Sequence, residues 1–359
     1  MAAKAIDDSS KFGTAPWSRL GARLAMLGSA LSALFCFALS GCRAPNEESN
    51  QDDAAWFRHE YDSIHMAVPW HLVLWLHADD ADASERAGRE HAEAAFREVS
   101  RLEHVASDWD DDSELARLSR ATSAAPGRLR VSRDLTALLA ISIELAAASE
   151  GAFDPTIGPV TRLWRRARFE KRLPSDAEIA AARARVDWRA VHVDTTTATV
   201  SWTSSRLEFD LGGIAKGFAL DAAVATLERR GVVRCLVEAG GDIACGAPPP
   251  GRHGWMIGLD NGPVRTITVP RGGIATSGAR YQYVEIGDDR YSHIIDPRTG
   301  IGLRSTKQRA APSITIVAPS ATLADGLATA CSILESGASA RESGAVARLL
   351  ERYGARRMP

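Results

Sequence analysis

The chain has 359 residues, a formal net charge of -2 and 45% hydrophobic residues. Such a chain can bury a large core, as one domain of roughly 250–300 residues or as two closely packed ones. The near-neutral charge gives no electrostatic basis for nucleic acid as the main partner. No segment repeats at a period of about 20–50 residues, which argues against a solenoid or propeller.

The N-terminus has the pattern of an export signal. Basic residues precede the apolar run "LAMLGSALSALFCFALSGC" at residues 24–42. This run is short for a membrane span and typical of a signal-peptide core. It ends in Leu39-Ser40-Gly41-Cys42, which resembles the bacterial lipobox. We therefore expect residues 1–41 to be a signal peptide and Cys42 to be a lipidated mature N-terminus; an uncleaved anchor is the alternative.

The residues after Cys42 are polar and poor in apolar side chains, which is typical of a flexible tether. We assign the tether to residues 42–60 and the folded domain to residues 61–359. The domain is then exported and anchored by lipid to a bacterial membrane, facing the periplasm or the cell exterior. Its three cysteines form no zinc-binding pattern. Cys235 and Cys245 could pair in an oxidising compartment, or Cys235 could simply belong to the core.

Helical patterns dominate the first half of the domain and strand patterns the second. After a strand at residues 70–77, we expect helices at 85–104 and, capped by Ser132, at 135–149; residues 162–189 read as charged, helical and solvated. From about residue 190 short strands prevail, including "RLEFDLGG" at 206–213, with helices at 216–230, 321–334 and near 345–353. This order predicts an α+β fold with mixed or antiparallel sheets rather than a doubly wound parallel sheet.

Three glycine-rich turns follow predicted strands: "DLGGIAKG" at 210–217, "EAGGDI" at 238–243 and "IATSGARY" at 274–281. Glycines let a ligand approach the backbone, and a helix N-terminus with Lys216 beside it favours phosphate. Each turn alone could be a tight corner between elements. The three together suggest a crevice lined for phosphate.

A predicted helix near residue 325 places Asp325 and Thr329 at i and i+4, on one face. Their hard oxygens could form part of a Mg²⁺ shell. The alternative is an exposed Asp and a Thr that bonds to its own helix. Further upstream, "YSHIIDPRTG" at 291–300 predicts a strand that ends in a polar turn. We expect Asp296, which precedes Pro297, to cap that turn.

Taken in order, "SDWDDDSEL", "GAFDPTIGPV", "DLGGIAKGFALD", "EAGGDI", "ATSG", "SHIIDPRTG" and "ADGLATA" resemble the signature motifs of the ApbE family, the FAD:protein FMN transferases. The resemblance runs from about residue 66 to about residue 336. It implies an ApbE-like α+β fold with the FAD site in a crevice between two sub-domains. It also implies Mg²⁺-dependent transfer of FMN from FAD to a Thr or Ser hydroxyl of a partner flavoprotein, with release of AMP. Family acceptors include respiratory-complex subunits.

The resemblance also implies a role for individual residues. His293 would be the catalytic base for the acceptor hydroxyl. The metal ligands would be Asp325, Thr329 and the backbone oxygen of Gly213. The residues lining the FAD site would be Met66, Trp109, Ala152, Phe153, Asp154, Asp210, Lys216 and Ile295.

The chain departs from the family pattern at four places. Trp109 stands where Tyr is usual, and either ring can stack on a flavin or adenine face. Glu238 replaces Asn before "GGD", and "ATSGARY" lacks a following acid and has Arg280 instead. The C-terminus lacks the expected apolar final strand. Two other functions stay open: an FAD pyrophosphatase that yields FMN and AMP, and a non-catalytic FAD-binding lipoprotein.

Overall fold

The computed structural model describes residues 55–124, 126–259, 266–278, 283–286, 289–306, 313–336 and 340–358. These residues belong to one unit, residues 52–359. The expected signal peptide, Cys42 and the tether as far as residue 54 lie outside the described residues, as does Arg280. None of the helices in the described part of the chain is long and apolar enough to cross a membrane.

A seven-stranded sheet forms the centre of this unit, and every neighbouring pair of strands in it is antiparallel. The strand order is β1 (Ala55–His65), β2 (Val68–Ala78), β6 (Cys235–Ala239), β7 (Asp242–Cys245), β10 (Gly272–Ser277), β14 (Ile314–Ala318) and β15 (Arg356–Arg357). The α+β class and the antiparallel pairing expected from the sequence are thus confirmed.

The described part of the chain also contains three smaller sheets. They are β3 (Gly127–Arg130), β5 (Thr199–Trp202) and β4 (Val191–Asp194); β11 (Tyr283–Ile286), β12 (Asp289–Asp296) and β13 (Ile301–Thr306); and β8 (Trp255–Gly258) with β9 (Thr266–Val269). The helices are α1 (Ala81–Ala106), α2 (Glu114–Ala121), α3 (Arg133–Ala148), α4 (Gly158–Glu170), α5 (Asp176–Arg183), α6 (Ala215–Arg229), α7 (Ala321–Ser336) and α8 (Ala340–Arg352).

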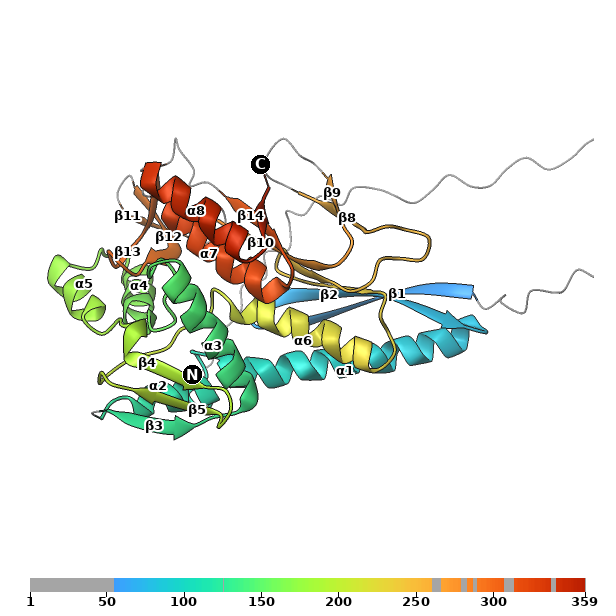
Figure 1. Ribbon diagram of the computed structural model, residues 1–359, viewed down its shortest axis with the longest axis horizontal. Helices are drawn as coiled ribbons and strands as arrows, with labels where there is room; N and C mark the ends of the chain where they lie inside the picture. The colour runs from blue at the N-terminus through green and yellow to red at the C-terminus, as the bar shows by residue number, and fades with distance from the viewer. Residues whose placement is uncertain are drawn as a thin grey trace, which may run out of the picture. The chain divides into compact units, whose positions relative to one another are not determined.

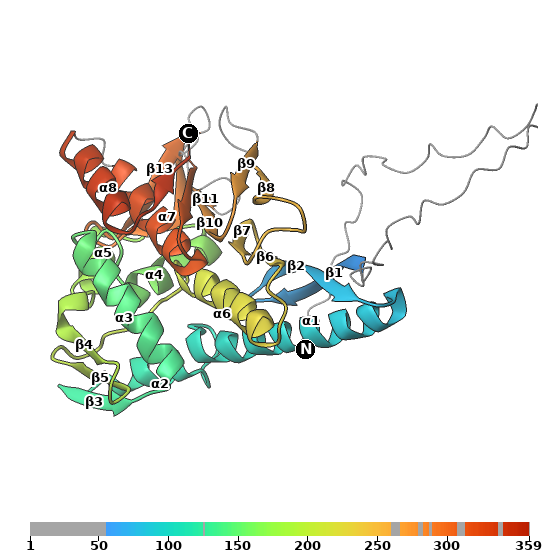
Figure 2. The ribbon, with the colours of Figure 1, turned by 45° about the vertical axis from the view of Figure 1, so that its right-hand side comes forward.

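Strand alternation divides the core between the two faces of the central sheet. On β2, Leu72 and Leu74 are buried against α1 and α6, whereas Val73 points to the opposite face and is buried with Trp255 and Ile257 of β8. Helix α6 runs beside α1 and packs on α7, which is covered in turn by α8 (Figures 1 and 2). This arrangement brings the N-terminal end of α6 against α7, and both segments carry predicted site residues.

The structure corrects three expectations about the elements. Strand β1 begins at Ala55, so the folded part starts within the expected tether. Residues 206–213 are not a strand, since only a single bridge from Glu208 to Ile157 forms there. Residues 162–189 are largely helical, as expected, but they form two helices with buried residues rather than only a solvated face: α4 ends at the left-handed Lys171, and Ser175 starts α5 with a capping box.

The structure also bears on the expectations about the cysteines and the C-terminus. Cys235, Cys245 and Cys331 are free and buried, so Cys235 is a core residue and not half of a disulfide. As far as the structure describes it, the C-terminus has no apolar final strand, as expected; it carries instead the two-residue β15, Arg356–Arg357, which pairs with β14.

Candidate active site

The predicted metal ligands come together where α6 begins against α7. The Thr329 hydroxyl lies 3.5 Å from the backbone oxygen of Gly213, to which it donates. The Asp325 carboxylate, one helical turn earlier, accepts a hydrogen bond of 3.0 Å from the backbone N–H of Gly217. A Cβ on Gly213 would lie 3.1 Å from the Thr329 Oγ1, so a glycine leaves this carbonyl open.

The donors at this point fit a hard cation. They are a carboxylate, a hydroxyl and a carbonyl, all oxygen, which is the preference of Mg²⁺. Asp325 is buried, with 8% of its surface exposed, so its carboxylate is kept from bulk water. Within the described residues, no group of three or more His, Cys, Asp or Glu side chains forms a second candidate metal site.

Helix α7 is held in register by a residue of α6. The Asp221 carboxylate accepts hydrogen bonds from the backbone N–H groups of Ala321 (2.9 Å) and Thr322 (2.8 Å), and from the Thr322 hydroxyl (2.5 Å). These N–H groups belong to the first turn of α7, which has no partners for them within the helix. Burial raises the pKa of Asp221, and the hydrogen bonds oppose that effect. Sequence reasoning missed this cap.

Two of the glycine turns meet through an ion pair. Lys216, in the first turn of α6, pairs with the buried Asp242 that follows the Gly240-Gly241 turn. The other Asp242 oxygen accepts from the backbone N–H of Thr276 at 3.0 Å, so the third turn joins the same cluster. The three motifs that looked separate in the sequence are therefore joined through the Asp242 carboxylate.

The Gly240-Gly241 turn also adjoins the predicted Met66 position. The N–H of Gly240 donates to the oxygen of Pro69 at 3.2 Å. Met66 lies in the β1–β2 turn with a positive φ of 50°, and its N–H donates to the Glu103 carboxylate at 2.8 Å. Glu238, the departure from Asn, accepts from the N–H of Gly241 at 2.6 Å and thus caps its own turn.

Asp210 connects the Gly212-Gly213 turn to the acidic loop that contains Trp109. Its carboxylate accepts from the N–H of Gly212 at 2.8 Å, which shapes the turn before Gly213. It also pairs with Arg165 of α4, whose guanidinium lies over the Trp109 ring. Trp109 is 73% exposed and thus available to a ligand.

Other predicted residues are buried in the core. The side chains of Ala152 and Phe153 belong to the core beneath α7, and Ile295 packs with Trp164. Any contact they make with FAD would therefore come mainly from their backbone. Asp154 is also buried and accepts from the N–H and hydroxyl of Thr156. Burial raises the pKa of Asp154 to about 6.

His293 lies on β12, a strand that packs against both α7 and α4. Its side chain is exposed, and the β12–β13 pairing changes register between Tyr291 and Ile295. Irregular pairing of this kind redirects side chains and is frequent beside active sites. Asp296 accepts from the N–H of Arg298 at 2.9 Å and from its guanidinium, so it braces the turn as expected.

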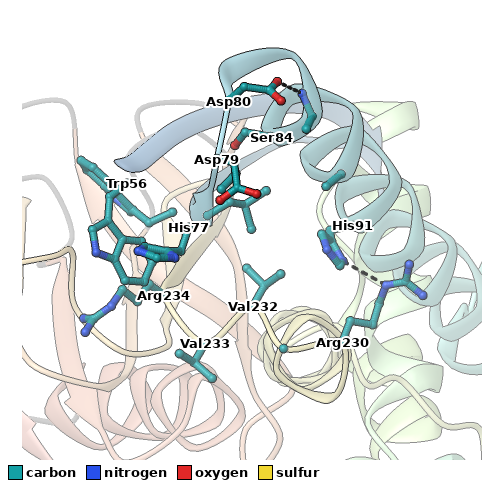
Figure 3. Close-up of a pocket in the computed structure, with 16 residues that line it drawn as sticks. Trp56, His77, Asp79, Asp80, Ser84, His91, Arg230, Val232, Val233 and Arg234 are labelled. Atoms are coloured by element: carbon teal, nitrogen blue, oxygen red, sulfur yellow. Dashed lines mark hydrogen bonds between the residues drawn. The ribbon is translucent and has the colours of Figure 1, made fainter. Parts of the chain in front are cut away.

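The FAD crevice that we expected between two sub-domains stays a prediction. A cavity of about 460 Å³ lies at the other end of α6, lined by Trp56, His77, Asp79, His91, Arg230 and Arg234 among others (Figure 3). Another, of about 500 Å³, lies on the β3–β5–β4 sheet. Neither is lined by a predicted site residue. The first one carries charges of both signs, so charge alone favours no ligand class there.

Comparison with known proteins agrees with this fold and these motifs. The pattern of the ApbE family matches residues 66–346. The chain belongs to the ApbE family, which confirms the resemblance seen in the sequence. It is 32% identical over 266 residues to the FAD:protein FMN transferase of Haemophilus influenzae, covering 70% of this chain and 74% of that one. It is 28% identical to the enzyme of the same name from Chlamydia trachomatis, covering 75% and 79%.

Solved structures show the same fold. The ApbE protein of Thermotoga maritima aligns with a TM-score of 0.70 and 28% identity, over 83% of this chain and 92% of that one. The flavinyl transferase ApbE of Pseudomonas stutzeri aligns with a TM-score of 0.66 and 26% identity, over 84% and 90%. The chain therefore has an ApbE-like fold, and it is a member of a family of transferase enzymes.

Proposed function

We propose that this protein transfers FMN from FAD to a Thr or Ser hydroxyl of a partner flavoprotein and releases AMP. The supporting observation is that three oxygen donors, on Gly213, Asp325 and Thr329, gather beside the glycine turns. The names of the relatives supply the reaction class. FAD would be the substrate and Mg²⁺ the metal.

Gly213, Asp325 and Thr329 would hold the metal. A Mg²⁺ ion held there would supply positive charge beside the pyrophosphate of FAD, which would make AMP a better leaving group. The Lys216 ammonium, in the first turn of α6, would supply a cation for the phosphate oxygens. Lys216 already pairs with Asp242, so it is held in place before a ligand arrives.

His293 would act as the base. The acceptor oxygen attacks the phosphorus of the FMN half, and the hydroxyl proton passes to the imidazole nitrogen. A new P–O bond forms to the acceptor, and the P–O bond to AMP breaks, with the bridging oxygen leaving on AMP. The exposure of His293 suits this role, because the hydroxyl must come from another protein.

A direct test uses residues 55–359 as a soluble domain with FAD, Mg²⁺ and a flavoprotein domain that contains a Thr or Ser acceptor site. The proposal predicts covalent flavin fluorescence on the acceptor and one AMP per flavin transferred, both lost after Asp325→Ala. AMP without a labelled acceptor would instead identify the pyrophosphatase. Bound FAD with no AMP would identify the non-catalytic lipoprotein.

We also propose that the protein is exported and lipid-anchored through Cys42, because Leu39-Ser40-Gly41-Cys42 resembles a lipobox. In cells that express the full chain, an alkyne fatty acid should label the wild type but not Cys42→Ala. The variant should also leave the membrane fraction. Equal labelling of both proteins would refute the anchor.

A further inference from the structure

A single guanidinium connects α4 to the loop that follows α1. Arg165 lies 2.5 Å from the Asp108 carboxylate and 3.4 Å from that of Asp210. Its central carbon also lies 3.9 Å from the centre of the Trp109 ring. One side chain therefore pairs with two acids and covers one face of an aromatic residue.

These contacts matter because Trp109 is 73% exposed. An exposed side chain on a loop ordinarily exchanges among rotamers. A cation stacked on one face favours a single ring orientation, and Trp is the aromatic residue that binds cations best in this way. The opposite face of the ring is then presented in one direction.

The guanidinium is itself restrained. Asp108 and Asp210 hold it from two sides, and its planar shape suits two carboxylates better than an ammonium would. Burial, and then the nearby Asp210 charge, raise the pKa of Asp108, while Arg165 lowers it. The Arg165 guanidinium thus offsets the repulsion between the Asp108 and Asp210 carboxylates. Because these two acids hold the guanidinium in place, it holds the Trp109 ring in place as well.

Asp210 makes the connection relevant to the candidate site. The same carboxylate that pairs with Arg165 accepts from the N–H of Gly212, next to the candidate ligand Gly213. The ring of Trp109 and the turn before α6 therefore share one anchor. A ligand that spans the two would meet surfaces whose separation is already set.

We propose that Arg165 is a positioning residue that fixes the Trp109 ring as a stacking wall for an aromatic ring of FAD. The inference rests on the proposed function. It adds a residue for which the sequence motifs gave no role, and it depends on Trp109 standing where Tyr is usual in the family. Fixing the ring in advance removes an ordering cost from binding.

The test is FAD affinity of the soluble domain, measured by quenching of flavin fluorescence without an acceptor. Arg165→Gln and Arg165→Lys should each weaken binding, the former by about 5- to 20-fold, as expected for the loss of a partly desolvated cation–π contact. Because Gln leaves two acids unpaired, Lys serves as the variant that preserves charge and folding. In turnover, KM for FAD should rise more than kcat falls.

Arg166 is the matched control. It is the next residue of α4, is exposed, and pairs with Glu178 on a different surface, so Arg166→Gln should leave FAD affinity unchanged. The decisive comparison repeats Arg165→Gln in a Trp109→Ala background. If Arg165 acts through the ring, Arg165→Gln should weaken FAD binding less than about twofold when Trp109 is already Ala.

The outcomes distinguish a failure of the proposed function from a failure of the role of Arg165. A wild-type domain that fails to bind FAD would overturn the proposed function. A wild-type domain that binds FAD, with Arg165→Gln binding equally well, would overturn only the role of Arg165. The role of Arg165 would also be overturned if Arg165→Gln reduced FAD affinity equally in the wild type and in the Trp109→Ala background. The effect would then not depend on the ring.

Discussion

The carboxylate of Asp325 in α7 and the backbone N–H of Gly217 in α6 are joined by a hydrogen bond of 3.0 Å. This bond is possible because Gly217 has no side chain. A Cβ there would lie 2.3 Å from the carbonyl oxygen of Ala321 and 2.9 Å from the Cβ of Asp325. Direct backbone contact between the two helices thus sets the position of a candidate metal ligand.

Gly217→Ala should therefore separate α6 from α7. We expect a loss of about 1–3 kcal/mol in unfolding free energy from overpacking. We also expect weaker binding of Mn²⁺, used as a probe for Mg²⁺, in a calorimetric titration. Gly258→Ala is the control, since a Cβ at that strand position meets nothing within 4 Å. Equal thermal unfolding of the two variants would show that the close contact is unimportant.

Local patterns predicted the parts of the site that lie on single elements. Helical spacing placed Asp325 and Thr329 on one face, and the structure keeps both at the α6 contact. The Asp296 turn was also readable, because an Asp before Pro caps its own turn. Gly213 came from the family resemblance, since a backbone oxygen leaves no pattern in side chains.

What the sequence could not provide depends on long-range packing. Asp221 caps α7 from 100 residues away, and no local rule identifies its partner. Arg165 reads as one more cation of a charged helix until Asp108 and Trp109 are beside it. Strand β1 escaped notice because its residues are half-buried or exposed, so hydrophobic alternation is weak.

Asp221→Ala should affect both stability and metal binding. It leaves N–H groups of Ala321 and Thr322 without their acceptor, which should cost about 1–2 kcal/mol. Because α7 then loses its register, calorimetry should show at least about fivefold weaker Mn²⁺ binding. That factor corresponds to about 1 kcal/mol.

Asp80→Ala is the matched control for that change. Asp80 caps α1 by accepting from the N–H of Ala83, and it lies at the cavity beyond the far end of α6. Its loss should lower stability by a similar amount and leave Mn²⁺ affinity unchanged. If both variants weaken Mn²⁺ binding equally, the Asp221 cap affects metal binding only through the general stability of the domain.

Asp154 should give the apo domain a measurable pH dependence. Burial raises its pKa from 3.8 to about 6. The folded state thus holds a proton that the unfolded state has already lost, and stability decreases as the pH rises from about 4 to beyond 6. The contribution lost is at most about 3 kcal/mol, from 1.36 kcal/mol per pKa unit.

Asp154→Asn removes this titration and keeps an oxygen that can accept from Thr156. Its stability relative to the wild type, from urea unfolding, should therefore increase between pH 4 and pH 7. Asp194→Asn is the control, because hydrogen bonds from Thr197 lower the pKa of that exposed carboxyl. If the difference in stability between Asp154→Asn and the wild type did not change with pH, Asp154 would not be a buried, protonated carboxyl.

His293→Ala should abolish transfer while substrate binding persists. The side chain is exposed on β12 and is neither a candidate metal ligand nor part of the core. Removal of a general base should lower kcat by about 10²–10⁴-fold. FAD affinity, measured by flavin fluorescence, and Mn²⁺ affinity should stay within about twofold of the wild type, a difference of less than 1 kcal/mol.

Two comparisons make the assignment of His293 specific. Exogenous imidazole should restore part of the transfer in His293→Ala, because it can enter the space left by the side chain and accept the proton. His192→Ala, which removes an exposed histidine of β4 in a different sheet, should transfer FMN at the wild-type rate. Wild-type transfer by His293→Ala would assign the base to another group, and a parallel loss of FAD binding would make His293 a binding residue instead.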